Sequence, residues 1–279
     1  METNLGAGGL PKVVLNAADG ARAELYLYGG QVTSWLPAGG VERLFLSERA
    51  EFRPGAAIRG GVPVCFPQFA GAGPLPKHGF ARTSPWSLLR LDQAGDSAQA
   101  VLQLADSAAT RAIWPHPFRA TLTITLGGAR LRLELDVQNT GAAPCSFTGA
   151  LHTYLRVEDV SRTAVEHLQG LRYRDSASGA QDVLESEPEV RFNGEVDRLY
   201  CNAPAQVIVR EPQRVMLVRS AGFPDVVVWN PGPVKGAALA DMQPDGYRQM
   251  VCVEAAVVST PAELLPGGTW SGMQELTAT

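Results

Sequence analysis

Alternating apolar and polar positions are the clearest pattern along this chain of 279 residues. In residues 120–139, apolar side chains occupy every second position on both sides of the pair Gly127-Gly128: Leu122, Ile124, Leu126, Leu131, Leu133, Leu135 and Val137. A period of two residues is typical of a β-strand with one buried face. Two such strands around a Gly-Gly turn predict a β-hairpin.

Shorter runs of the same kind recur along the chain, and Gly, Pro, Asp or Asn separate most of them. We expect strands at 24–28, 31–36, 43–46, 86–91, 100–104, 207–210, 215–219, 226–229 and 250–258. Many short strands at this spacing predict an all-β sandwich or barrel. Because no Ser-rich linker or change in composition divides the chain, we expect a single domain over 1–279, with residues 1–10 as a loose N-terminal tail.

Composition narrows the class of protein further. The chain has 29 glycines and 20 prolines, above the average usage of about 7% and about 5%. Both residues interrupt helices, which disfavours a helical bundle. Apolar residues make up 45% of the chain, enough for a sizeable core. The net charge of −4 argues against a nucleic-acid partner or an anionic membrane surface, because both need concentrated Lys and Arg.

The sequence also bears on cellular location. No run approaches the about 20 apolar residues that a membrane span requires, and the first residues show no basic-then-apolar signal segment. The four cysteines, Cys65, Cys145, Cys201 and Cys252, lie far apart and form no CxxC pair. We therefore expect a cytoplasmic protein with four reduced thiols.

His152 is a first candidate for chemistry. It lies in 147–157, FTGALHTYLRV, where alternation puts it on one strand face with Ala150, Tyr154 and Arg156. A face with small, aromatic and cationic side chains beside a histidine is a plausible pocket wall. The alternative is an ordinary solvated strand face.

Glu254 is the more unusual residue, because it interrupts the nearly unbroken apolar run MVCVEAAVVS at 250–259. Alternation places it on one strand face with Cys252, Ala256 and Val258. An ionised carboxylate is expensive to bury without a partner. Glu254 is therefore either paired for structural reasons or placed for chemistry with a raised pKa.

A group of basic residues surrounds the segment richest in Gly and Pro, at 53–76. This segment is too apolar for a flexible linker, so we expect an ordered loop over a sheet face. Arg59 lies within it, and Lys77, His78 and Arg82 follow directly in KHGFAR at 77–82. Together they form a cationic cluster suited to a small anion such as a phosphate monoester, although single basic residues are more often simply solvated.

Motifs for common cofactors do not occur in the sequence. The chain has no GxxxxGK[ST], HExxH or GxSxG, and Gly71-Ala72-Gly73 lacks the third glycine of a dinucleotide fingerprint. His116 and His167 have no metal-ligand spacing to another histidine. We therefore expect no metal, nucleotide or flavin.

Several blocks of the chain, in this order, resemble the glucose-6-phosphate 1-epimerases (hexose-6-phosphate mutarotases) of the aldose 1-epimerase superfamily. They are AAIRGGVPVCFPQF at 56–69, KHGFAR at 77–82, ALHTYLRV at 150–157, VDRLY at 196–200, VVVWNPG at 226–232 and DMQPDGYRQMVCVEAA at 241–256. The resemblance implies a galactose-mutarotase-like β-sandwich of antiparallel strands. It also implies a monomer that interconverts sugar-phosphate anomers without a cofactor.

The same resemblance implies roles for individual residues. His152 corresponds to the general acid and Glu254 to the general base. Arg59, Arg82, Asp197 and the residue at Lys77 would surround the substrate. Members of this family often have Gln where this chain has Lys77, so the lysine is a departure that could strengthen phosphate binding or change substrate preference.

The residue types also fit this chemistry without reference to the family. Anomer exchange opens the hemiacetal ring, which needs a base for the anomeric hydroxyl and an acid for the ring oxygen. A histidine and a carboxylate can share that work near neutral pH. Two other functions stay open: a mutarotase for neutral aldoses such as galactose, and a non-catalytic carbohydrate-binding β-sandwich.

Overall fold

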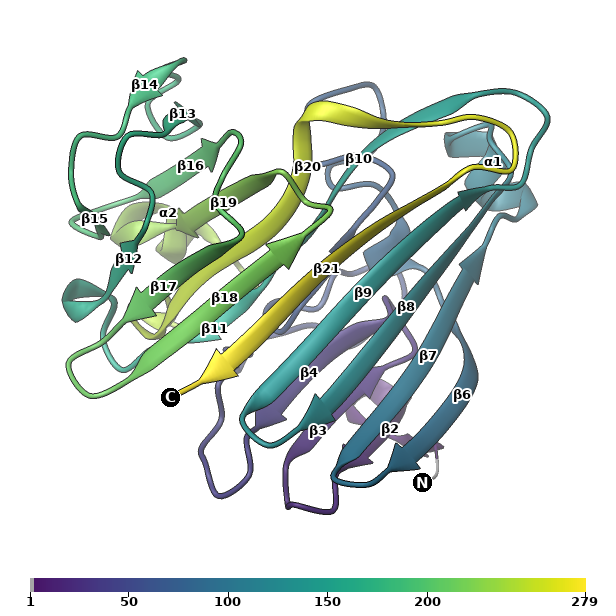
Figure 1. Ribbon diagram of the computed structural model, residues 1–279, viewed down its shortest axis with the longest axis horizontal. Coiled ribbons are helices and arrows are strands. Elements are labelled where there is room, and N and C mark those ends of the chain that lie inside the picture. Colours follow the sequence, from purple (N-terminus) through teal and green to yellow (C-terminus); the bar gives the residue numbers. More distant parts are fainter. Residues whose placement is uncertain (1–2) are drawn as a thin grey trace.

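The computed structural model describes residues 3–279, which form three antiparallel β-sheets (Figure 1). The nine-stranded sheet has the order β15-β12-β17-β18-β21-β9-β8-β7-β6. Its strands are β6 (Ser87–Ala94), β7 (Ser97–Ala105), β8 (Phe118–Gly127), β9 (Arg130–Asn139), β12 (Ala164–Glu166), β15 (Glu189–Arg191), β17 (Gln206–Arg210), β18 (Val215–Ala221) and β21 (Thr269–Ala278).

The eight-stranded sheet has the order β14-β13-β16-β19-β20-β10-β5, and β11 also pairs with β20. Its strands are β5 (Val64–Cys65), β10 (Cys145–Leu151), β11 (Tyr154–Arg156), β13 (Arg172–Asp175), β14 (Val183–Leu184), β16 (Val196–Tyr200), β19 (Asp225–Asn230) and β20 (Met250–Leu264). The four-stranded sheet follows chain order, with β1 (Thr3–Leu5), β2 (Pro11–Asn16), β3 (Arg22–Tyr26) and β4 (Gln31–Leu36).

Helices are short throughout the described residues. The α-helices are α1 (Ala108–Ile113) and α2 (Gly232–Ala238), and the 3₁₀ turns are η1 (Ala7–Gly9), η2 (Ala81–Thr83), η3 (Val160–Arg162) and η4 (Gly246–Gln249). Within 3–279, no helix is long and apolar enough to cross a membrane. The predicted all-β fold of antiparallel sheets is therefore confirmed.

The predicted hairpin at 120–139 is β8 and β9, with Leu122 opposite Leu135. Its turn lies one residue later than the sequence indicated. Gly127 still pairs with Arg130, so the turn residues are Gly128 and Ala129, and Gly128 has a φ of 57°. A turn that needs positive φ takes a glycine at that position, and the second glycine of the pair fills this role.

The prediction of a strand at 43–46 is wrong. The strand predicted at 31–36 occurs with those bounds, and the other predicted strands occur with shifted ends. Leu44 and Leu46 make only isolated bridges, to Leu155 and Gly60. One oxygen of the Glu42 carboxylate accepts hydrogen bonds from the backbone N–H groups of Arg43 and Leu44, at 3.0 and 2.9 Å. The pairing of the segment also changes along its length, because the Phe45 N–H donates to Tyr154 O and the Ser47 N–H donates to Arg59 O, both at 3.0 Å. Each partner is held for a single bridge, so no continuous strand forms.

Residues 3–10 are ordered, which contradicts the loose tail predicted at 1–10. Met1 and Glu2 lie outside the described residues. β1 pairs with β2, with Thr3 opposite Val13. Leu10 is buried in a small apolar cluster with Tyr26, Tyr28 and Ile58. This stretch is therefore attached to the four-stranded sheet.

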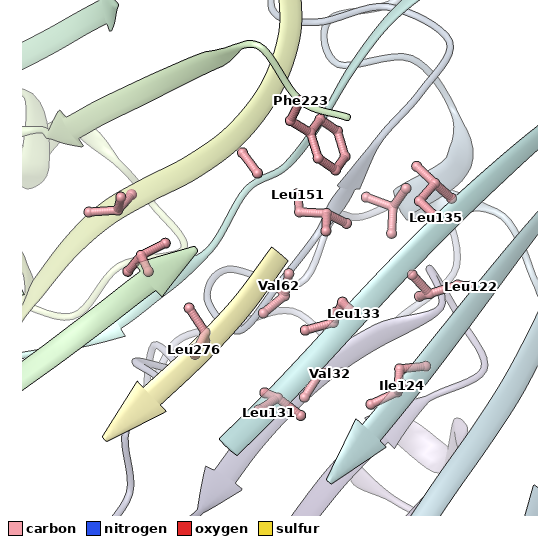
Figure 2. Close-up of a cluster of buried hydrophobic side chains, with 14 of the residues drawn as sticks. Val32, Val62, Leu122, Ile124, Leu131, Leu133, Leu135, Leu151, Phe223 and Leu276 are labelled. Atoms are coloured by element: carbon pink, nitrogen blue, oxygen red, sulfur yellow. The ribbon is translucent and has the colours of Figure 1, made fainter. Parts of the chain in front are cut away.

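The main core lies between the sheets. Figure 2 shows Leu131 and Leu133 of β9 and Leu276 of β21 from the nine-stranded sheet, together with Val32 of β4 and Leu151 of β10 from the other two sheets. The same buried cluster runs from Val13 to Ala278. Packed apolar side chains on this scale dominate the free energy of folding.

The first eight residues of β20, 250–257, are buried on both faces of the sheet, which explains the nearly unbroken apolar sequence there. Val251, Val253 and Ala255 face the main core, whereas Cys252 and Ala256 belong to a second apolar cluster on the opposite face of the eight-stranded sheet. Glu254 alternates onto this second face. The candidate site lies there.

Candidate active site

The register of the eight-stranded sheet brings His152 and Glu254 together across 102 positions of sequence. β10 and β11 both pair with β20, and the partners are Leu151 with Ala255 and Tyr154 with Cys252. Continuing this register between the two strands places His152 opposite Glu254. Their side chains meet, with 3.4 Å between His152 Nε2 and Glu254 Oε1.

This pair is buried and incompletely hydrogen-bonded. The Glu254 side chain is 1% exposed and the His152 side chain 9%. Among the described residues, neither Glu254 Oε2 nor His152 Nδ1 has a hydrogen-bond partner. The His152 ring stacks on Tyr154, with centroids 4.8 Å apart, and meets Trp229 edge-on at 5.8 Å. The alternative interpretation, that His152 lies on a solvated strand face, is therefore wrong.

Burial disfavours the charged form of both partners. It raises the pKa of the Glu254 carboxyl well above its usual range, and nearby Asp197 adds to this rise. Burial lowers the pKa of the His152 imidazole well below its usual range, with further lowering from the Arg82 and Arg59 cations. A pair shifted in these directions suits proton transfer, because one proton can reside on either partner.

The pair lies in a cavity of about 500 Å³. All seven side chains that the sequence singled out line it: His152, Glu254, Arg59, Lys77, His78, Arg82 and Asp197. The loop predicted at 53–76 enters the eight-stranded sheet through β5 and contributes Phe69, Ala70 and Gly71 to the same wall. The structure thus brings these residues together, while their individual roles stay predictions.

A larger cavity, of about 820 Å³, opens elsewhere, on the nine-stranded sheet. Its charged lining includes Arg130, Arg219 and Glu275, but it contains no histidine and no buried carboxylate. It therefore lacks a counterpart of the His152–Glu254 pair, and the smaller cavity is the candidate active site.

Arg59 is held in place from two sides. Its Nε donates to Asp241 Oδ2 at 3.1 Å, and its Nη1 donates to the Tyr154 hydroxyl at 2.9 Å. Tyr154 and Asp241 raise the pKa of the guanidinium, which remains charged. A guanidinium fixed in this way loses little freedom when it binds an anion.

His78 belongs to the cluster as a neutral ring and not as a cation, which corrects the sequence analysis. Burial, together with the Arg82, Lys77 and Arg59 cations, lowers its pKa to about 3. Its Nδ1 accepts from the Ala70 N–H at 3.3 Å and lies 3.2 Å from Cys65 Sγ, a thiol whose pKa burial raises to about 12. Since both neighbours are donors, the proton of the His78 ring is on Nε2.

The cavity lining also includes Lys235 and Asp197, which carry opposite charges. Lys235 Nζ of α2 lies 2.5 Å from Glu195 Oε1 and 3.8 Å from Asp197 Oδ2. Burial raises the pKa of the Asp197 carboxyl, and Lys235 opposes that rise. In the same lining, Arg82 Nη2 donates to the backbone oxygen of Lys77 at 3.2 Å, which orders the KHGFAR segment.

Sequence reasoning missed Lys235, Asp241 and Trp229 as parts of this site. Asp241 reaches Arg59 from 182 positions away, and Lys235 enters from a seven-residue helix. Neither residue stands out in its own segment, since each is an ordinary polar residue in a loop or helix. Trp229 could have been found from the alternation of β19, which puts it on one strand face with Val227.

One group of metal-ligand type occurs among the described residues: His152, Cys252 and Glu254, whose ligand atoms lie within 4.8 Å of one another. Metal binding would need the thiol and the carboxyl in deprotonated form. Burial raises the pKa of both groups well above their usual ranges. These residues therefore fit a resident metal poorly, and the absence of a cofactor stays a prediction.

Comparison with known proteins agrees with this geometry. The family model for aldose 1-epimerase matches residues 11–277. A relative from Cenchrus ciliaris, described as "Putative glucose-6-phosphate 1-epimerase", is 41% identical, over 97% of this chain and 85% of its own length. One from Escherichia coli (strain K12), with the same description, is 36% identical, over 85% of this chain and 80% of its own length.

Solved structures show the same fold. A crystal structure titled as a "putative mutarotase" from Salmonella typhimurium superposes with a TM-score of 0.90 and is 31% identical, covering 97% of this chain and 90% of that one. A galactose mutarotase-like protein from Clostridium acetobutylicum, 14% identical, has a TM-score of 0.77 over 100% of this chain and 98% of its own. The galactose-mutarotase-like sandwich is thus confirmed, and the chain belongs to the aldose 1-epimerase family.

Proposed function

We propose that this member of the family is a hexose-6-phosphate mutarotase that interconverts the α and β anomers of glucose 6-phosphate and related aldohexose 6-phosphates. The observation that carries the proposal is a buried, incompletely paired carboxylate facing a histidine on the floor of a cavity with cations at its wall. The descriptions of the Cenchrus ciliaris and Escherichia coli relatives support the choice of substrate.

In the proposed mechanism, the Glu254 carboxylate removes the proton from the anomeric hydroxyl while the His152 imidazolium protonates the ring oxygen. The C1–O5 bond breaks, and C1 becomes the carbonyl carbon of the open-chain sugar. Rotation about C1–C2 presents the other face of the carbonyl. In ring closure, the neutral imidazole takes the proton from the O5 hydroxyl while the Glu254 carboxyl returns its proton to O1, so the pair ends with the single proton with which it began.

The burial of His152 and Glu254 supports a mechanism in which the two side chains share one proton. Glu254 with a raised pKa is a stronger base once ionised, and His152 with a lowered pKa is a stronger acid once protonated. Their 3.4 Å separation suits two groups that act on adjacent oxygens of one sugar, O1 and O5. No cofactor takes part in any of these steps.

The phosphate group would bind to Arg59, Lys77 and Arg82, with the Nε2–H of His78 as a neutral donor. A phosphate monoester carries close to two negative charges near neutral pH, and guanidinium groups bind it through paired hydrogen bonds. Asp197, which also lines the cavity, would accept from sugar hydroxyls. An anchored phosphate would keep the sugar in place while C1 rotates.

Two rival functions are less well supported. A mutarotase for neutral aldoses would have no use for three cations around one cavity. A non-catalytic sugar-binding sandwich would gain nothing from Glu254, because a buried carboxylate without full hydrogen bonding costs stability. The predicted monomeric state and cytoplasmic location stay predictions.

The deciding experiment compares anomer exchange of glucose 6-phosphate and free galactose by NMR magnetisation transfer, with and without the protein. We expect faster exchange for the phosphorylated sugar, and a much larger loss for glucose 6-phosphate than for free glucose in Arg59→Ala. Arg172→Ala is the matched control, since Arg172 lies exposed in the same sheet outside the cavity. Equal losses for both sugars in Arg59→Ala would remove the phosphate role, and faster exchange of galactose alone would favour the neutral-aldose enzyme.

A further inference from the structure

Gln274 is a polar residue at a position where β21 otherwise faces the core. Alternate residues of this strand, Gly272, Leu276 and Ala278, are buried on the same face. Gln274 is 0% exposed. A buried amide costs free energy unless its donor and acceptor are both paired, so its partners indicate what it does.

The hydrogen-bond ladder between β10–β11 and β20 is interrupted beside His152. The Thr153 N–H donates to Leu151 O at 3.0 Å, which forms a tight turn centred on His152, instead of donating across to β20. The Val253 N–H still donates to Thr153 O at 3.1 Å. The carbonyl of Val253, the residue before Glu254, is thereby left without its ladder donor.

Gln274 supplies the missing partner. Its Nε2 donates to Val253 O at 3.1 Å, and its Oε1 accepts from the Thr153 hydroxyl. One buried amide from the nine-stranded sheet thus bridges the two residues next to the His152–Glu254 pair. On its other side, the turn is held by the His152 N–H, which donates to Pro63 O at 2.9 Å.

We propose that Gln274, acting through Thr153 and Val253, is a positioning residue that holds His152 in its turn opposite Glu254; the kinetic part of this proposal rests on the proposed function. Without the amide, Val253 O has no donor unless the Thr153 N–H swings back into the ladder. That movement flattens the turn and changes the position of the imidazole relative to the carboxylate. An error of about 1 Å in catalytic geometry can cost about 10²-fold in rate.

The test uses pairs of variants. Gln274→Met keeps the side-chain length but removes both hydrogen bonds, and we expect kcat for glucose 6-phosphate to fall about 10- to 100-fold with KM changed less than about threefold. Thr153→Val should lower kcat in the same way, whereas Thr153→Ser, which keeps the hydroxyl, should restore it. Combining Gln274→Met with Thr153→Val should add little to either loss, because both remove one link.

Asn139→Leu is the matched control. Asn139 is a buried amide that donates to Ala143 O at 2.8 Å and Leu264 O at 3.0 Å, away from the site. We expect it to reduce stability while leaving kcat per folded molecule and its pH profile at wild-type values. Gln274→Met should change that pH profile, because the separation of His152 and Glu254 changes.

A readout independent of turnover separates this proposal from the proposed function. The ring resonances of His152 in ¹H–¹⁵N NMR spectra should move in Gln274→Met and Thr153→Val but not in Asn139→Leu or Thr153→Ser. If the wild-type protein does not exchange glucose 6-phosphate, the proposed function fails and these resonances still decide the positioning role. The positioning role would be overturned if a folded Gln274→Met had wild-type kcat and unmoved His152 resonances. If Gln274→Met does not fold, the same result in Thr153→Val would overturn the positioning role.

Discussion

Asp225 and Glu254 are two buried carboxylates on the same face of neighbouring strands, and they differ in how the protein satisfies them. Asp225 lies beside Ala256 on β20, two residues from Glu254. Its oxygens accept from the Val258 N–H at 2.9 Å and from the Ser259 N–H and hydroxyl at 2.7 and 2.6 Å. Glu254 has only His152, at 3.4 Å, and its Oε2 has no partner among the described residues.

The contrast is between a carboxylate with a structural role and the one for which we propose a chemical role. Both groups lose water on folding, but hydrogen bonds replace that water only around Asp225. The cavity lies over Glu254, so a substrate hydroxyl can take the place that the protein leaves empty. A carboxylate left short of partners beside a cavity is thus a marker of function, and burial alone is not.

The largest loss of activity that the comparison predicts comes from replacing His152, the partner of Glu254. Replacement His152→Ala removes the proposed general acid, and we expect the rate of glucose 6-phosphate anomer exchange to fall by about 10²- to 10⁴-fold. The fold should survive, as judged by circular dichroism, because His152 Nδ1 has no hydrogen bond to lose. Near-wild-type exchange in a folded His152→Ala would end the acid–base assignment.

Asp225→Asn should act on stability and leave chemistry alone. The substitution places an amide group against the donors of Val258 and Ser259, and hydrogen bonds to charged groups are worth about 1.5–3 kcal/mol each. We expect a loss of about 3 kcal/mol in the free energy of unfolding, measured by urea titration. An undiminished unfolding free energy would remove the structural half of the comparison.

Glu254→Gln should have the opposite effect on stability. The folded-state pKa of Glu254 lies above its unfolded value, so the folded state binds more protons and wild-type stability falls as pH rises through that interval. Glutamine does not ionise, and the Tm advantage of Glu254→Gln over wild type should grow from pH 4 to pH 8. Each kcal/mol recovered corresponds to about 2–4 °C for chains of about 150–250 residues. A Tm difference that shrinks with rising pH would contradict the raised pKa.

The smallest expected effect is at His78, beside the same cavity. Because its pKa is lowered to about 3, its ring should remain neutral, with the proton on Nε2, from pH 5 to pH 8. Histidine side-chain ¹H–¹⁵N NMR spectra measure this directly. Titration of His78 with a midpoint near 6.5 would return it to the group of cations.

Local patterns predicted the parts of the molecule whose partners are close in sequence. The hairpin at 120–139 follows from alternation alone, and Glu254 was conspicuous because it interrupts an apolar run. The same alternation predicted which residues share a face with His152, since β10 and β11 keep one register on β20.

The remaining features depend on contacts that no local pattern contains. Asp241 matters because it holds Arg59, 182 positions away. The neutral state of His78 depends on burial and on the cations around it, and its tautomer depends on the Ala70 N–H at Nδ1. The strand predicted at 43–46 fails because the segment pairs first with Tyr154 and then with Arg59, which hydropathy does not reveal.

The central claim is that Glu254, and not buried carboxylates in general, performs the chemistry. The most direct test measures anomer exchange of glucose 6-phosphate with wild type, Glu254→Gln and Asp225→Asn at equal concentrations of folded protein. We predict that Asp225→Asn exchanges at close to the wild-type rate while Glu254→Gln loses about 10²- to 10⁴-fold. Equal rates for Glu254→Gln and wild type, or equal losses in both variants, would contradict this account.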